Sequence, residues 1–213
     1  MAIIVGGSSG ASADVDATPK ASRVILYGAD GTPMQPSPSW SGVYPVVVKQ
    51  STAAVAGQIV WGLYNSSATK TVSITSLDFW MYFDGTAAAT LMKYEMVKYT
   101  GVTSFSGGAV VVPMHKRSTL SGAVVSVARV LDTGLTQGGG TAQGAVQLGA
   151  QGRVTQTTTN FNVNRYNPMV GDERGVLNGM SIELAQNELL ALRQVVVSVI
   201  GDNLVGFVEV TEY

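Results

Sequence analysis

The chain has 213 residues, 46% of them hydrophobic and only 13% charged, so it can bury one large core but offers few charges to water. Its formal net charge of −1 excludes a basic field that would attract nucleic acid, and the absence of cysteine excludes disulfides and cysteine-based metal sites. So few charges favour a surface that is hidden in an assembly, with a monomer solvated by Ser and Thr as the alternative.

The N-terminal 42 residues are predicted to form an extended arm that contains one strand. Gly6–Lys20 is small and polar, which favours a segment that becomes ordered only against a partner. Ser22–Gly28 predicts the strand, and the following Asp30–Gly31 predicts a turn. Met34–Gly42 places Pro36 and Pro38 beside Trp40 and predicts an extended linker. We therefore divide the chain into an arm, residues 1–42, and a body, residues 43–213.

The body is predicted to be a succession of strands, because β-branched and aromatic residues fill short runs that Gly, Asn, Asp and Ser separate. The runs are Val43–Lys49, Gln58–Tyr64, Thr71–Phe83, Ala109–Pro113, Gly122–Leu131, Met180–Leu184, Arg193–Ile200 and Leu204–Tyr213. Their number and spacing predict an all-β fold, an antiparallel β-sandwich with a jelly roll as the leading topology and a barrel as the alternative.

Five segments of the body carry more specific predictions. The apolar positions change parity within Val72–Phe83, which predicts a bulge or kink near Ser76. Leu91–Tyr99 favours a strand over a helix, and Gln156–Asn164 predicts a polar strand or extended segment. Thr133–Gly152 contains seven glycines and predicts a long mobile loop, and Leu184–Leu192 predicts a helical turn.

No membrane contact is expected from the sequence. No uninterrupted apolar stretch approaches the roughly 18 residues that span a bilayer. Met1–Val5 is too short for the core of a signal peptide and has no basic start.

The residue types that carry catalysis are isolated from one another. His115 is the single histidine, so it has no second His or Cys with which to form a metal or nucleophile site, and a structural or surface role is predicted. Asp172–Arg174 follows a glycine and predicts a solvated loop. Asp78, Asp84 and Glu95 form no evident pair of facing carboxylates of the kind a glycosidase needs. The glycine-rich Gly6–Gly10 and Gly138–Gly140 lack the Lys and Ser/Thr of a phosphate loop. We therefore expect no enzyme, no catalytic residues, no cofactor and no metal.

The three tryptophans are expected to serve different purposes. Trp61 and Trp80 lie within apolar runs and are predicted to be in the core. Trp40 lies in the proline-rich linker and is predicted to contact a partner, most simply by packing the arm against a neighbouring subunit.

Several segments resemble structural proteins of tailed bacteriophages. The first is the N-terminal series Ala13–Asp16, Ala21–Tyr27 and Asp30–Gly31, in which a polar arm leads to a strand and an Asp-Gly turn. The others are Ile74–Gly85, Tyr94–Gly108 and Ile182–Tyr213, which ends on `VEVTEY`. The resemblance spans most of the chain and rests on the pattern and order of these segments.

The resemblance implies a β-sandwich subunit of a virion without enzymatic activity. The leading expectation is a cement or decoration protein on the capsid, a homo-oligomer and most often a trimer, that binds the major capsid protein or neighbouring tail or head subunits. The alternative is a tail or head fibre, or a receptor-binding module that recognises a glycan of the host surface. The arm would dock onto the partner, and its expected contact residues are Val15, Arg23, Ile25, Tyr27 and Trp40.

Overall fold

The computed structural model describes residues 2–6, 11–15, 25–26, 38–49, 55–83, 90–116, 119–120, 122–153, 164–166, 182–197 and 201–213. The chain divides into two compact units, Met1–Ser37 and Pro38–Tyr213. The part of the chain described here contains strands and turns but no helix. Pro38 to Gly42 belong to the second unit, so the predicted boundary between residues 42 and 43 lies five residues too far along the chain.

The first unit is a three-stranded antiparallel sheet with the order β1-β2-β3. The strands are β1 (Ala2–Gly6), β2 (Ala11–Val15) and β3 (Ile25–Leu26). The sequence led us to expect one strand in this region, and that prediction was wrong. The prediction used only the local composition, which is small and polar. Ala11–Val15 is nevertheless a strand, because it pairs with the apolar Ala2–Gly6.

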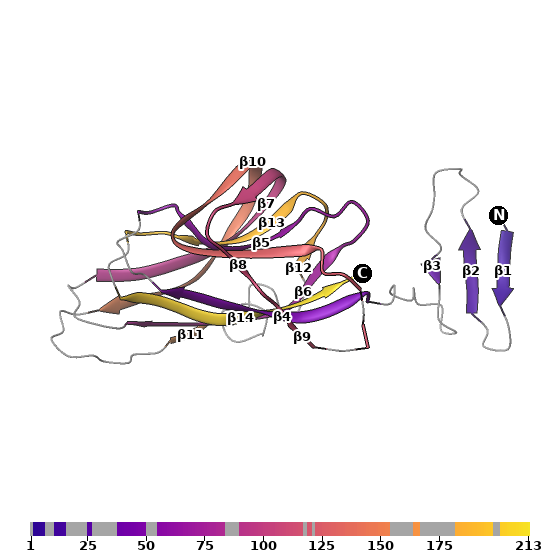
Figure 1. The fold of residues 1–213 in the computed structure, drawn as a ribbon, viewed down its shortest axis with the longest axis horizontal. Coiled ribbons are helices and arrows are strands. Elements are labelled where there is room, and N and C mark those ends of the chain that lie inside the picture. Colours follow the sequence, from indigo (N-terminus) through magenta and orange to yellow (C-terminus); the bar gives the residue numbers. More distant parts are fainter. Residues whose placement is uncertain are drawn as a thin grey trace. The chain divides into compact units, whose positions relative to one another are not determined.

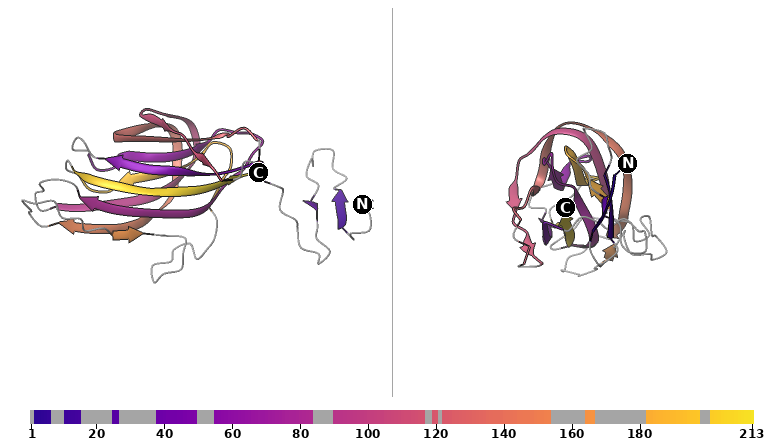
Figure 2. Two further views of the ribbon diagram at one scale, coloured as in Figure 1. Left: turned by 60° about the horizontal axis from the view of Figure 1, so that its bottom comes forward. Right: turned by 90° about the vertical axis from the view of Figure 1, so that its right-hand side faces the viewer.

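The second unit contains two antiparallel sheets, which form two layers (Figure 1). The six-stranded sheet has the order β11-β6-β14-β4-β9, and β12 also pairs with β6. Its strands are β4 (Trp40–Lys49), β6 (Val72–Phe83), β9 (Met114–His115), β11 (Asn164–Tyr166), β12 (Ile182–Leu184) and β14 (Asp202–Glu212). In Figures 1 and 2, β14 (yellow) runs through the middle of this sheet between β4 and β6.

The five-stranded sheet has the order β5-β13-β7-β10-β8 and curls until β10 also pairs with β5 (Figure 2). Its strands are β5 (Ile59–Asn65), β7 (Thr90–Ser106), β8 (Ala109–Val111), β10 (Ser126–Arg153) and β13 (Glu188–Gln194). The long β10 makes this closure possible, since its first part pairs with β5 and its later part with β7.

Two apolar clusters hold the second unit together. The larger cluster lies between the two sheets and includes Trp61, Leu190 and Leu192, and the smaller one includes Phe105, Leu189 and Ala191. Successive residues of β13 therefore point to different clusters, because side chains alternate along a strand. This arrangement confirms the predicted all-β sandwich, and the jelly-roll topology stays a prediction.

The bulge expected near Ser76 is confirmed. Ser76 pairs with Glu209 and Ile74 with Val210, so Thr75 is the extra residue in β6. Leu91–Tyr99 is strand, as predicted, within β7. Trp61 is buried, also as predicted, whereas Trp80 is only partly buried and packs beside Phe207.

The glycine-rich segment was predicted incorrectly. Thr133–Gly152 lies within β10 and pairs with β7 from Thr136 onward, so it is not a loop. Its glycines fit this strand because Gly139, Gly140 and Gly144 have positive φ, and Gly139 and Gly144 lie at or inside shifts of the register.

Two predictions near the C-terminal end are also wrong. Gln186–Asn187 form a turn between β12 and β13, with Asn187 at a φ of 62°, and no helical turn is present in Leu184–Leu192. β13 ends at Gln194, so residues 195–197 are not strand, and residues 198–200 lie outside the described residues. Gln156–Asn164 also lies outside them except for Asn164, which begins β11.

Candidate interaction surface

The side of the six-stranded sheet that faces away from the five-stranded sheet is built of cross-strand rows. One row is Trp80, Val205 and Val47, the next is Asp78, Phe207 and Pro45, and a third is Ser76, Glu209, Val43 and Met114. Alternate residues of β4, from Trp40 to Val48, are buried against the core, so the residues between them must point outward.

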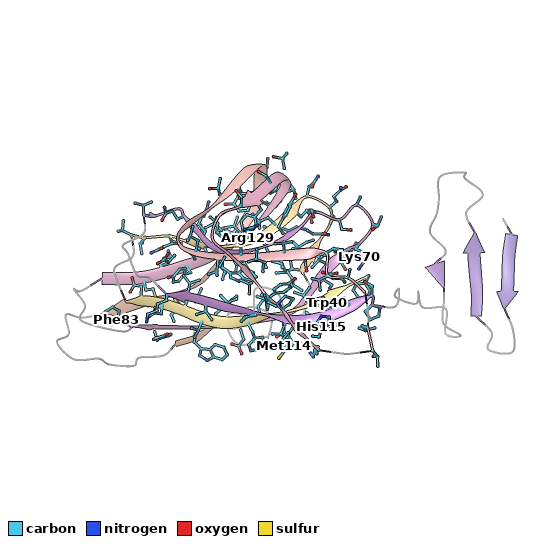
Figure 3. The ribbon with its side chains drawn as sticks, viewed as in Figure 1. Trp40, Lys70, Phe83, Met114, His115 and Arg129 are labelled. Atoms are coloured by element: carbon cyan, nitrogen blue, oxygen red, sulfur yellow. The ribbon has the colours of Figure 1, made fainter. Side chains whose placement is uncertain are left out.

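Apolar side chains occupy most of these outward positions. We call Val43, Pro45, Val47, Trp80, Met114, Val205 and Phe207 the outer apolar face. Val47 is 58% exposed and Met114 67% exposed, and the rings of Trp80 and Phe207 lie 6.1 Å apart at 46°. Figure 3 places Met114 on the outer side of the sheet. A contiguous apolar surface of this kind marks an interaction site on a folded protein.

The acidic groups within these three rows are engaged within the chain. The Lys116 ammonium lies 2.8 Å from the Glu209 carboxylate, which neutralises the acidic group of the third row. Asp78 is buried, and both Asp78 and Lys49 interact with other groups of the chain. The register also places Arg165 of β11 opposite Trp80 and the exposed Glu183 of β12 opposite Ser73, so charged residues border the outer apolar face at β11 and β12.

One end of the sandwich contains a buried polar cluster centred on Glu212. Its Oε1 accepts hydrogen bonds from the Ser126 hydroxyl at 2.6 Å and the Ser126 amide at 2.9 Å, and its Oε2 accepts one from the Val125 amide at 3.1 Å. Lys70 Nζ lies 3.8 Å from Oε2. The Tyr44 hydroxyl donates to the Ser126 carbonyl at 2.8 Å.

This cluster fastens the start of β10 to the end of β14. Burial raises the pKa of Tyr44 to about 12; the Ser126 hydrogen bond lowers it, and the nearby Glu212 carboxylate raises it further. The Ser126 hydroxyl donates to a carboxylate, and the one histidine of the chain is engaged elsewhere. We therefore interpret the cluster as a structural clasp.

Trp40 was expected to lie in a linker and to contact a partner, and the structure contradicts this. It is the first residue of β4, and its side chain is fully buried in the main core. Its indole Nε1 donates to His115 Nδ1 at 3.1 Å, and the two rings meet edge to face (Figure 3). The prolines suggested a linker, but pairing with Glu212 of β14 makes Trp40 part of the sheet. His115 thus has a structural contact, as predicted.

The other four predicted contact residues belong to the first unit. Val15 lies in β2 and Ile25 in β3, and the register places them on opposite faces of that sheet, since Val15 pairs with Ala2 and Ile25 with Asp14. Arg23 and Tyr27 lie outside the described residues.

Sequence reasoning missed the outer apolar face. A signal was present, because Val46–Val48 and Leu204–Phe207 carry apolar residues at both parities of a strand, the pattern of a sheet that is covered on both sides. We had interpreted these runs only as strands and had assigned Trp80 to the core.

Comparison with known protein families, with curated proteins and with solved structures found no match to this chain. Among the residues that the structure describes, no helix has the length and apolarity needed to cross a bilayer. The same residues contain no group of three or more His, Cys, Asp or Glu arranged to hold a metal ion.

Proposed function

We propose that this chain is a structural protein without enzymatic activity that binds other protein subunits through its outer apolar face. The observation that carries the proposal is the outer apolar face itself, in which Val47 and Met114 are exposed and Trp80, Val205 and Phe207 are partly exposed in the single chain. Interfaces are enriched in aromatic residues and Met and depleted of charge at their centre, and this face has that composition.

We further propose that the assembly is a virion and that the chain is a cement or decoration protein of the capsid. Three features support this: the resemblance to tailed-phage structural proteins, the low content of charge and the sandwich fold. The first unit supports a docking role as well. Its register places Ala2, Ile4, Ala13, Val15 and Leu26 on one face of a single-layer sheet, and a sheet of this kind needs a surface to cover it.

The test is to purify particles produced from the genome that encodes this chain and to quantify the chain in them by mass spectrometry. A structural subunit should be present at a fixed number of copies per particle. Val47→Glu places a charge on an exposed position of the outer apolar face and should abolish incorporation. Val55→Glu is the matched control, because Val55 has the same residue type and nearly the same exposure, 59%, but lies in the turn before β5. Equal incorporation of both variants would refute the use of this face.

A second candidate function is recognition of a host-surface glycan, which the partly exposed pair Trp80 and Phe207 favours. Aromatic rings can stack on sugar rings, but these two are tilted by 46° and do not form one flat platform, so this function ranks second. Quenching of tryptophan fluorescence by host polysaccharide, lost in Trp80→Ala and kept in Val55→Glu, would support it.

A further inference from the structure

We propose that β9 is an acid-sensitive strap, which opens when His115 gains a proton. This strand consists of two residues, it pairs with Gly42 and Val43 of β4, and both of its side chains are exposed. An edge strand of this length buries little and belongs to the least stable parts of a fold. The side-chain contact of His115 therefore weighs heavily in keeping it in place, whatever the outer apolar face binds.

The contact is a hydrogen bond from the buried Trp40 to the exposed His115 (Figure 3). The indole Nε1 lies 3.1 Å from Nδ1 and 3.3 Å from Nε2 of the imidazole. Gly42 makes this reach possible. A Cβ added there would lie 2.4 Å from the Trp40 ring and 2.7 Å from the Met114 carbonyl oxygen, so the missing side chain leaves the space through which the indole meets β9.

A proton on His115 removes the acceptor. An indole N–H can only donate, and a neutral imidazole has one acceptor nitrogen. Both ring nitrogens lie within 3.3 Å of the indole nitrogen, so either neutral tautomer can accept. The imidazolium carries a proton on both nitrogens and cannot accept. No further acceptor for the Trp40 N–H lies among the described residues, so its donor would stay buried and unpaired beside a positive charge.

The titratable groups around this pair are bonded to partners other than His115. They belong to the segment of β9, to β14 and to β4, and they are Lys116, Glu209, Glu212 and Tyr44. His115 is the single histidine of the chain. A change between about pH 8 and about pH 5 that depends on an imidazole can therefore come from His115 alone.

Acid should shift β9 from the closed to the open arrangement. With His115 protonated, the closed arrangement keeps an unpaired donor in the core, whereas in the open one water accepts the indole N–H. The stabilisation from this hydrogen bond is thus present at neutral pH and is lost as the pH falls. Opening frees the backbone edge of β4 at Gly42 and Val43, and a free strand edge can pair with a strand of another chain.

The experiment measures amide hydrogen exchange of the full chain at about pH 8 and about pH 5, the range in which imidazoles titrate. The reporter is the Lys116 amide, which follows β9 directly and donates to the Ser41 carbonyl at 2.9 Å. Its protection factor, which corrects for the intrinsic effect of pH on exchange, should fall about 10-fold at the lower pH. The Val102 amide, which donates to the Asn187 carbonyl away from β9, should keep its protection.

His115→Gln is the matched variant, because its side-chain oxygen can accept the indole N–H and does not titrate. The effect of pH on the Lys116 amide should be absent in this variant. An equal fall in protection in the variant and the natural chain, or no fall in the natural chain, would overturn the inference.

A second measurement needs no variant that keeps β9 closed. The chain has one histidine and three tryptophans, so the imidazole and indole signals can be followed separately by nuclear magnetic resonance. The Trp40 indole signal, assigned by its loss in Trp40→Phe, should change with the same midpoint as the ring protons of His115. A Trp40 signal that does not respond while His115 titrates would refute the strap.

Discussion

The clasp at Glu212 gives the sharpest test of how this fold is held together. We predict that Glu212→Gln destabilises the protein by about 2 kcal/mol, although the side chain keeps its size. The carboxylate offers acceptors to the Val125 amide, the Ser126 amide and the Ser126 hydroxyl. The Gln side chain has one acceptor oxygen and one NH₂ donor. In one orientation the NH₂ group faces the Val125 amide and Lys70, and in the other it faces the Ser126 amide, so in either case a donor faces a donor.

The magnitude follows from the number of contacts. A hydrogen bond to a charged group contributes about 1.5–3 kcal/mol and a neutral one about 0.5–1.5 kcal/mol, so weakening three of them costs about 3 kcal/mol. Removal of the buried charge recovers part of its desolvation penalty, which leaves about 2 kcal/mol. The assay is urea unfolding followed by tryptophan fluorescence, since Trp40 and Trp61 are buried.

The matched control is Glu209→Gln on the same strand. Glu209 forms a surface ion pair with Lys116, whose side chain is 51% exposed, and such pairs contribute at most about 1 kcal/mol. Glu212→Gln should therefore cost clearly more than Glu209→Gln. If the two variants lost the same stability, the clasp would have no special role and the reasoning would be refuted.

Three further predictions concern single residues. The unfolded chain releases the Tyr44 proton near pH 10 and the folded chain near pH 12, so the stability that Tyr44 contributes is complete below pH 10 and falls by about 2–3 kcal/mol by pH 12. Tyr44→Phe should lack this component when urea unfolding is compared at the two pH values. Gly206→Ala should cost about 3 kcal/mol in urea unfolding, because its Cβ would lie 2.1 Å from the Asp78 carbonyl oxygen, which belongs to a paired backbone. Gly62→Ala should cost about 1–2 kcal/mol, because its Cβ would lie 2.7 Å from the Phe105 ring, and a double-mutant cycle should show a smaller cost when Phe105 is Ala, with the contact to Leu189 at 3.0 Å remaining.

The strands could be predicted where the local sequence decides the conformation. The run Leu204–Tyr213 is β14 almost to the residue, and the change of parity within Val72–Phe83 located the bulge at Thr75 to within a residue. In both cases the signal is the alternation of residue types along the segment, which arises because successive side chains of a strand point to opposite faces of the sheet.

The incorrect predictions concern segments whose conformation is decided by pairing with a strand that is distant in the sequence. Thr133–Gly152 has the composition of a loop, and it is a strand because β7 pairs with its backbone. Trp40 lies among prolines, and it is a core residue because Glu212 lies opposite it. Strand propensity depends on neighbours in the sheet, and a single sequence does not record which strands become neighbours. The candidate surface was missed for the same reason, since the rows that form it exist only once β4, β6 and β14 are side by side.

The central position of β14 has a consequence for how the protein acquires its fold. β4 and β6 are not paired with each other, and both pair with a strand that the ribosome makes much later; Ser39 and Glu212, for example, bond across 173 residues of chain. The two early strands have to persist with open edges until β14 arrives between them. Pairing over such distances makes folding slow and leaves strand edges exposed to other chains during synthesis. Rapid expression should therefore favour aggregates of the nascent chain, and slower synthesis at low temperature should favour the folded protein.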